Sequence, residues 1–162
     1  MASTGSTSKE SVAVQIEPKT GISFPVKLDD GMELVAVGLR KKSILGLGGI
    51  KVYGFGIFAD NEKLKEVLRL KIGSKAPSKP TKEMYEAVLD SDVGMMVRVF
   101  ADASDNIKLT SGSIINIGLK DVVVSKVESE LLCKAYFHMY LGDEAFDVDA
   151  KERFGHSLLS LF

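Results

Sequence analysis

An arginine and a tyrosine, Arg40 and Tyr53, are the residues of this chain best placed to do chemistry together. They lie in two neighbouring alternating segments that a basic, glycine-rich connection joins. With that connection centred near Gly46 and Leu47, antiparallel pairing sets the two side chains opposite each other, with Cβ atoms about 5 Å apart. A guanidinium and a phenol that converge beside small and apolar residues predict a site for a carboxylate. The prediction depends on register, because a slip of one residue would separate the pair.

Alternation along the two segments would position this pair. The later segment, Lys51 to Ala59, places five residues on one face: Lys51, Tyr53, Phe55, Ile57 and Ala59. The earlier one, Glu33 to Arg40, places four on one side, namely Leu34, Ala36, Gly38 and Arg40, and Val35, Val37 and Leu39 on the other. Parity alone leaves a second interpretation open, in which Arg40 only ends an edge strand and Tyr53 is a core aromatic.

The rest of the chain predicts short strands and four helices. The further strands are expected at Val12 to Glu17, Phe24 to Leu28, Gly94 to Ala101, and as one or two strands in Ile107 to Val124 with a break at Gly118 to Asp121. The helices are expected at Glu62 to Leu70 after the N-cap Asp60, Lys82 to Leu89, a stretch that ends at Gly142, and Val148 to Ser160. The fold class is therefore α+β, an antiparallel sheet with helices packed on one face.

The helix that ends at Gly142 carries the strongest helical pattern. Ser125 and Glu128 match a capping box at its start. One apolar stripe is expected to face the core: Val127, Leu131, Leu132, Ala135, Tyr136 and Met139. Cys133 lies in the apolar run LLCKAY, so we expect a buried structural thiol rather than a nucleophile.

Size and composition indicate one domain of an ordinary globular protein. Residues 1–10 are expected to be a disordered lead and residues 11–162 to form the domain. The formal net charge of −1 gives no reason to expect a nucleic acid as partner. No apolar run reaches the roughly 18 residues of a membrane span, and a single cysteine allows no intrachain disulfide. Oligomeric state does not follow from the sequence.

Other motifs favour structural interpretations. LGLGGIK at residues 45–51 lacks the spacing of a phosphate loop and precedes a strand instead of a helix. His138 and His156 lie on separate predicted helices without partners at ligand spacing, so no metal site is expected. The acidic cluster at residues 143–149 suits a helix start, and no GxSxG occurs. We therefore predict no catalytic residue, no metal and no cofactor.

Three runs resemble the chalcone-isomerase-fold fatty-acid-binding proteins of plants. They are EPKTGISFP at residues 17–25, VGLRKKSILGLGGIKVYGFGIFAD at residues 37–60, and VESELLCKAYFHMYLGDEAFDVDAKERFG at residues 127–155. The resemblance implies an open-faced β-sandwich that holds a long-chain fatty acid between sheet and helices, in the chloroplast stroma. In that family an arginine and a tyrosine bind the carboxylate, and they match Arg40 and Tyr53. The match therefore favours the ligand-binding interpretation over the one in which Arg40 only ends an edge strand and Tyr53 is a core aromatic.

The chain departs from this family in its middle. Family members carry a helix-rich stretch after the strand that matches Gly94 to Ala101, whereas here Phe100 is followed almost at once by DASDNIKLTSG. A second, shorter deletion is expected near Ile117 to Lys120. True chalcone isomerases place their reactive groups in the missing stretch and have a threonine where this chain has Tyr53. We therefore expect non-catalytic binding of a fatty acid, and keep two alternatives open, a chalcone-flavanone isomerase and a ligand-free remnant of the fold.

Overall fold

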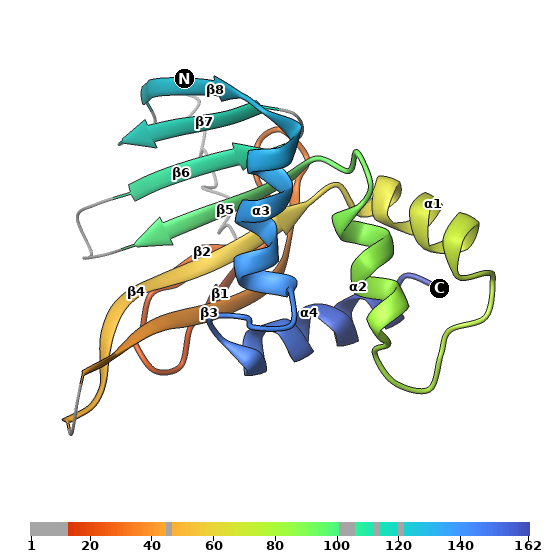
Figure 1. Ribbon diagram of the computed structural model, residues 1–162, viewed down its shortest axis with the longest axis horizontal. Helices are drawn as coiled ribbons and strands as arrows, with labels where there is room; N and C mark the ends of the chain where they lie inside the picture. The colour runs from red at the N-terminus through yellow and green to blue at the C-terminus, as the bar shows by residue number, and fades with distance from the viewer. Residues whose placement is uncertain (1–12, 45–46, 101–105, 112–113, 120–121) are drawn as a thin grey trace, which may run out of the picture.

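A six-stranded antiparallel sheet forms the centre of the computed structural model, which describes residues 13–44, 47–100, 106–111, 114–119 and 122–162 (Figure 1). Strands adjacent in sequence are adjacent in the sheet, in the order β3 (Glu33–Ile44), β4 (Leu47–Ala59), β5 (Met95–Phe100), β6 (Asn106–Ser111), β7 (Ile114–Leu119) and β8 (Val122–Glu128). A separate two-stranded sheet pairs β1 (Val14–Ile16) with β2 (Ser23–Pro25). The predicted α+β class with an antiparallel sheet is confirmed.

Four helices complete the described part of the chain: α1 (Asn61–Lys71), α2 (Lys82–Leu89), α3 (Glu130–Leu141) and α4 (Val148–Leu159). In Figure 1, α3 crosses in front of the sheet and α4 runs beside β3. The larger core lies between the sheet and these helices, where Phe55 and Ile57 of β4 meet Phe137 of α3 and Phe154 of α4. A smaller core on the opposite face is covered by Phe24 of β2. The Asp60 N-cap is confirmed, since its side chain accepts a hydrogen bond from the Lys63 amide.

A register shift in β3 corrects one predicted face. The pairing with β4 passes from Leu34 opposite Phe58 to Ala36 opposite Ile57, with Val35 as the extra residue. Such a bulge changes which face the residues before it point to. Leu34 consequently packs in the smaller core with Phe58, and Val35 joins the larger core, contrary to the predicted alternation. From Ala36 onward the predicted faces are correct, with Ala36 in the core beneath the helices and Val37 in the opposite one.

The prediction for Ile107 to Val124 was also too simple, because three strands occupy this region. The break predicted at Gly118 to Asp121 begins too early, because β7 continues through Gly118 to Leu119 before β8 starts at Val122. A further division separates β6 from β7, and β8 continues to Glu128 because residues from Ile114 to Ile117 pair with it. Residues 1–10, expected to be disordered, lie outside the described residues, as does Gly46. The predicted centre of the connection at Gly46 and Leu47 is wrong for Leu47, which begins β4 and pairs with Ile44.

This extension of β8 displaces the start of α3. Ser129, rather than Ser125, is the N-cap, and its side chain accepts a hydrogen bond from the Leu132 amide at 3.2 Å. The predicted apolar stripe is wrong as well. The buried residues of α3 are Cys133, Phe137, Tyr140 and Leu141, while Leu131 is 80% exposed. The helix is apolar on both sides, so contact with the sheet and α2, rather than periodicity, selects its buried face. The predictions of a buried Cys133 and of an end at Gly142 are confirmed.

Side chains of α4 and of the loop before it cover the open edge of β3. Asp147 accepts a hydrogen bond from the Leu39 amide at 2.9 Å, while Arg153 and Ser157 donate to the carbonyls of Val37 and Val35 at 2.8 and 2.9 Å. These three strand residues alternate, as do the outward backbone groups of an edge strand. Because an edge with unpaired amides and carbonyls invites further strands, α4 closes the sheet on this side.

Close contact between α4 and the sheet requires a glycine at residue 38. A Cβ atom there would lie 2.6 Å from the Cβ of Ala150 and would also overlap the ring of Phe55. Real Cβ contacts are not this short, so any larger residue would push α4 away from β3. The missing side chain at Gly38 therefore sets how closely α4 and the loop before it approach β3. The next residue of β3 that faces the helices is Arg40.

Candidate functional site

Arg40 and Tyr53 face each other across the first strand pair of the sheet. They are direct partners in the pairing of β3 with β4, as the sequence predicts. The guanidinium Nη1 donates a hydrogen bond to the Tyr53 hydroxyl at 3.5 Å, the outer limit of such a bond. Both side chains are partly exposed and lie on the face that the helices cover. The predicted placement is confirmed, and the ligand-binding role of the pair stays a prediction.

Two aromatic rings frame the guanidinium. The Arg40 Cζ atom lies 4.2 Å from the centroid of the Phe146 ring and 5.4 Å from that of Tyr53. Phe146 comes from the loop between α3 and α4, directly before the N-cap Asp147. A cation held against aromatic faces keeps a defined orientation while its edge N–H groups remain available. The site therefore combines a positive charge with an apolar surround.

Two tyrosines of α3 extend this site, and the sequence did not single them out for it. The Tyr53 hydroxyl lies 3.0 Å from the Tyr140 hydroxyl, which lies 2.9 Å from that of Tyr136. The spacing of four residues puts Tyr136 and Tyr140 on one side of α3. That spacing is the signal in the sequence, but the apolar pattern places Tyr136 in a stripe that faces the core and predicts no role for Tyr140. We call the hydroxyls of Tyr53, Tyr140 and Tyr136 the hydroxyl chain.

Burial makes the two α3 phenols harder to ionise than exposed tyrosines. It is the main cause that raises the pKa of Tyr140 far above its ordinary value, and proximity to Tyr136 adds to the effect. Burial likewise raises the pKa of Tyr136, against a smaller lowering by its hydrogen bond with Tyr140. Desolvation has this sign because it disfavours the charged phenolate. At physiological pH these groups are therefore neutral donors and acceptors beside the positive Arg40.

Edge-to-face ring contacts hold the hydroxyl chain in place. The ring of Tyr140 lies 4.8 Å from that of Phe55 on β4 and 5.4 Å from that of Phe146, in nearly perpendicular arrangements. Such pairs stabilise by about 0.5–1.5 kcal/mol beyond their buried area. The site is thus built on the sheet and a packed helix, with Phe146 alone coming from a loop.

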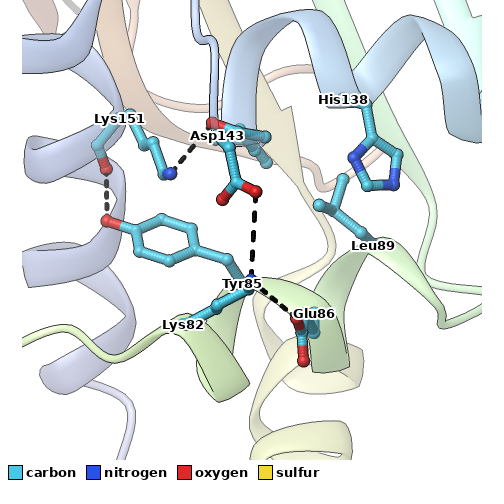
Figure 2. Close-up of a pocket in the computed structure, with 9 residues that line it drawn as sticks. Lys82, Tyr85, Glu86, Leu89, His138, Asp143 and Lys151 are labelled. Atoms are coloured by element: carbon cyan, nitrogen blue, oxygen red, sulfur yellow. Dashed lines mark hydrogen bonds and ion pairs between the residues drawn. The ribbon is translucent and has the colours of Figure 1, made fainter.

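A hollow of about 270 Å³ lies elsewhere, among the helices (Figure 2). Figure 2 shows Lys82 between Glu86 and Asp143. The Lys82 Nζ atom lies 3.8 Å from a carboxylate oxygen of Glu86 and 3.9 Å from one of Asp143. Lys151 donates to the Gly142 carbonyl at 2.9 Å, and its ammonium lies over the ring of Tyr85. The charged groups of this hollow thus already have partners within the protein. We therefore place the candidate site at Arg40 and Tyr53 instead.

The residues expected to have no special role are found at ordinary positions. His138 and His156 are exposed, and His156 lies 3.8 Å from Glu152. Among the described residues, no cluster of three histidine, cysteine or acidic side chains is arranged to hold a metal ion. None of the helices in the described ranges has the length and apolar character needed to cross a membrane.

Comparison with known proteins identifies relatives with this fold. No family model matches the chain. It is 46% identical to chalcone isomerase-like protein 1 of Humulus lupulus, over 93% of this chain and 94% of the relative. It is 29% identical to fatty-acid-binding protein 1 of Arabidopsis thaliana, over 90% of this chain and 71% of that protein. A crystal structure of an Arabidopsis fatty-acid binding protein superposes with a TM-score of 0.85 and 26% identity, over 92% of this chain and 98% of that one.

These alignments also show that this chain is shorter than its relatives. The alignment with the Humulus protein runs over 202 positions, whereas this chain has 162 residues, so at least 40 positions of the relative have no counterpart here. The helical layer is correspondingly shortened. In this chain only five residues join β5 to β6, at the place where the sequence predicts the main deletion. On the identity and coverage of the Humulus relative, this protein belongs to the chalcone isomerase-like family.

Proposed function

We propose that this protein binds a long-chain fatty acid without catalysing a reaction, with the carboxylate on Arg40 and Tyr53 and the acyl tail between sheet and helices. The observation that carries the proposal is the direct pairing of Arg40 with Tyr53 across the strands β3 and β4. Relatives named fatty-acid-binding proteins support the class of ligand.

The geometry of the pair suits an anion. The bond from Arg40 to Tyr53 is long, at 3.5 Å, so a carboxylate that replaces it gives up little. Guanidinium–carboxylate bonds are charge-assisted and often bidentate, and a phenol hydroxyl adds one further donor. The rings of Phe146 and Tyr53 keep water from one side of the guanidinium, which strengthens its attraction for a negative charge.

The expected binding free energies differ between the tail and the head group. A tail with about 14 buried CH₂ groups gains roughly 11 kcal/mol before costs, at about 0.8 kcal/mol each. Hydrogen bonds to charged groups add about 1.5–3 kcal/mol each, and association takes back several kcal/mol. The tail thus sets the affinity, and the Arg40–Tyr53 pair selects an acid and fixes its orientation.

The alternative of isomerase activity is not favoured. The Humulus relative is named only isomerase-like, and the Arabidopsis relatives are named as binding proteins. The chain also has Tyr53 at the position where the resemblance expects a threonine in true isomerases. The plastid stroma stays a prediction from that resemblance.

Removal of the Arg40 charge tests the proposal. We expect Arg40→Ala to weaken binding of dodecanoate or palmitate by about tenfold or more, as measured by calorimetry, because one charge-assisted contact is lost. Arg69→Ala, which removes an exposed arginine of α1, is the matched control and should bind like the wild type. Binding by Arg40→Ala equal to that of the wild type would refute the role of Arg40 in holding the carboxylate. A folded wild type that carries no lipid in native mass spectrometry, and binds none when it is added, would favour the ligand-free remnant.

A further inference from the structure

We infer that Tyr140 is a positioning residue, which commits its own hydroxyl proton to Tyr53 and so leaves the Tyr53 proton for the ligand carboxylate. The inference rests on the proposed function and assigns a role to a residue outside the Arg40–Tyr53 pair. It begins from the hydroxyl chain, whose two oxygen–oxygen distances of 3.0 and 2.9 Å are both hydrogen bonds in which either atom can donate.

A count of protons shows which donor directions the hydroxyl chain allows. Three hydroxyls carry three protons, and two links use two of them, so one proton is left over. When Tyr136 donates to Tyr140 and Tyr140 donates to Tyr53, the spare proton is on Tyr53, next to the guanidinium. When the direction reverses, the spare proton is on Tyr136 and Tyr53 has none to offer. Both arrangements keep both links, so a carboxylate at Arg40 selects the first without breaking a bond.

The first arrangement also strengthens the contact with the ligand. A hydroxyl that accepts a hydrogen bond donates a stronger one, because the links polarise one another. Tyr53 then accepts from Tyr140 and donates to the carboxylate. Arg40 and Tyr53 would thereby act together as donors to one anion, with Tyr140 behind them and out of contact with it.

The surroundings of Tyr140 allow its hydroxyl to be tested separately from its ring. Tyr140 is 2% exposed and its ring packs against Phe55 and Phe146. Tyr140→Phe would keep that ring packing and remove both links of the chain. Tyr136→Phe would remove only the outer link and leave the donor to Tyr53 in place. The two variants therefore separate the effect of the hydrogen bond from Tyr140 to Tyr53 from the effect of ring packing.

A thermodynamic cycle tests the inference with dodecanoate and its uncharged methyl ester as ligands. We expect Tyr140→Phe to weaken dodecanoate binding about two- to fourfold, because the Tyr53 hydroxyl then donates to the carboxylate without the polarisation that the bond from Tyr140 supplies, and to leave binding of the ester unchanged. In the Tyr53→Phe background, the Tyr140→Phe change should have no further effect. Tyr136→Phe should give a smaller loss than Tyr140→Phe.

Contrary outcomes are equally distinct. Equal losses for acid and ester, or the same loss with and without the Tyr53 hydroxyl, would show that Tyr140 acts only through packing and would overturn the inference. No loss in Tyr140→Phe, with Arg40→Ala and Tyr53→Phe both impaired, would overturn it while the proposed function stands. A wild type that binds no fatty acid would overturn the proposed function and this role together.

Discussion

The charges of the candidate site are divided between a permanent cation and phenols that stay neutral. A phenolate beside Arg40 would pair with the guanidinium and repel a carboxylate, so an anion site needs Tyr140 and Tyr136 protonated. Phenols with the ordinary pKa of about 10 are already protonated at neutral pH, and burial, the main cause of the raised pKa of both residues, extends this to alkaline pH. The same desolvation that suits the site has a consequence for stability at alkaline pH.

Stability should fall above the ordinary phenol pKa of about 10. Below it, both states hold their protons and the tyrosines contribute no pH dependence. Above it, the unfolded chain releases protons that folded Tyr136 and Tyr140 still hold, so the free energy of unfolding falls by at most about 1.4 kcal/mol per pH unit for each residue. Urea unfolding between pH 8 and pH 11 should show a smaller decline in the Tyr136→Phe/Tyr140→Phe variant. Parallel curves for the variant and the wild type would contradict the prediction.

At the scale of elements, the loop between α3 and α4 links the site to the edge of the sheet. Asp147 caps α4 through the Ala150 amide at 3.1 Å and accepts from the Leu39 amide of β3 at 2.9 Å. Its neighbour Phe146 lies against the guanidinium of Arg40. One turn of backbone therefore fixes the start of α4, the edge of β3 and one wall of the candidate site.

Loss of the Asp147 carboxylate should be costly for this reason. Asp147→Ala removes a helix cap and leaves the Leu39 amide without its acceptor, so we expect a loss of about 2–3 kcal/mol in the free energy of unfolding. Asp147→Asn, which can still cap, should recover part of it. Asp143→Ala, which removes an exposed carboxylate 3.9 Å from Lys82, is the control and should cost less than about 1 kcal/mol. Similar losses for Asp147→Ala and Asp143→Ala would refute the role of Asp147.

The same scale explains what could be predicted from the sequence. Strand alternation predicts the faces of Arg40 and Tyr53 correctly, and the shift at Val35 lies before them. Their direct pairing also depends on two register shifts nearer the connection, between Arg40 and Lys41 and between Lys42 and Ile44, which the sequence does not predict. Tyr140 was missed because α3 carries apolar residues on both sides, with Leu131 exposed and Phe137 buried. Periodicity cannot choose between two apolar faces, and the choice is made by tertiary contact with β4 and α2. The start of α3 was misplaced for a related reason, since pairing of β8 with β7 overrode the capping signal at Ser125.

At the scale of the whole molecule, the shortened helical layer affects the two ends of the proposed site differently. The carboxylate end of the proposed site rests on β3, β4 and α3, which are all described here. At least 40 positions of the Humulus relative have no counterpart in this chain. Less helical cover leaves less wall for an acyl tail, while the Arg40–Tyr53 pair is unaffected. Selection of an acid and dependence on tail length should therefore respond differently to this shortening.

A series of octanoate, dodecanoate, palmitate and stearate would measure that difference. Each CH₂ that enters the wall adds about 0.8 kcal/mol, or about fourfold in affinity, and each CH₂ beyond it adds almost nothing. We expect affinity to level off at a shorter chain in this protein than in fatty-acid-binding protein 1 of Arabidopsis thaliana, measured side by side by calorimetry. Arg40→Ala should lower every affinity by a similar factor and leave the length of the plateau unchanged, because the head group and the tail contribute separately. A rise that continues through stearate equally in both proteins would mean that the remaining helices and the sheet still enclose the whole tail.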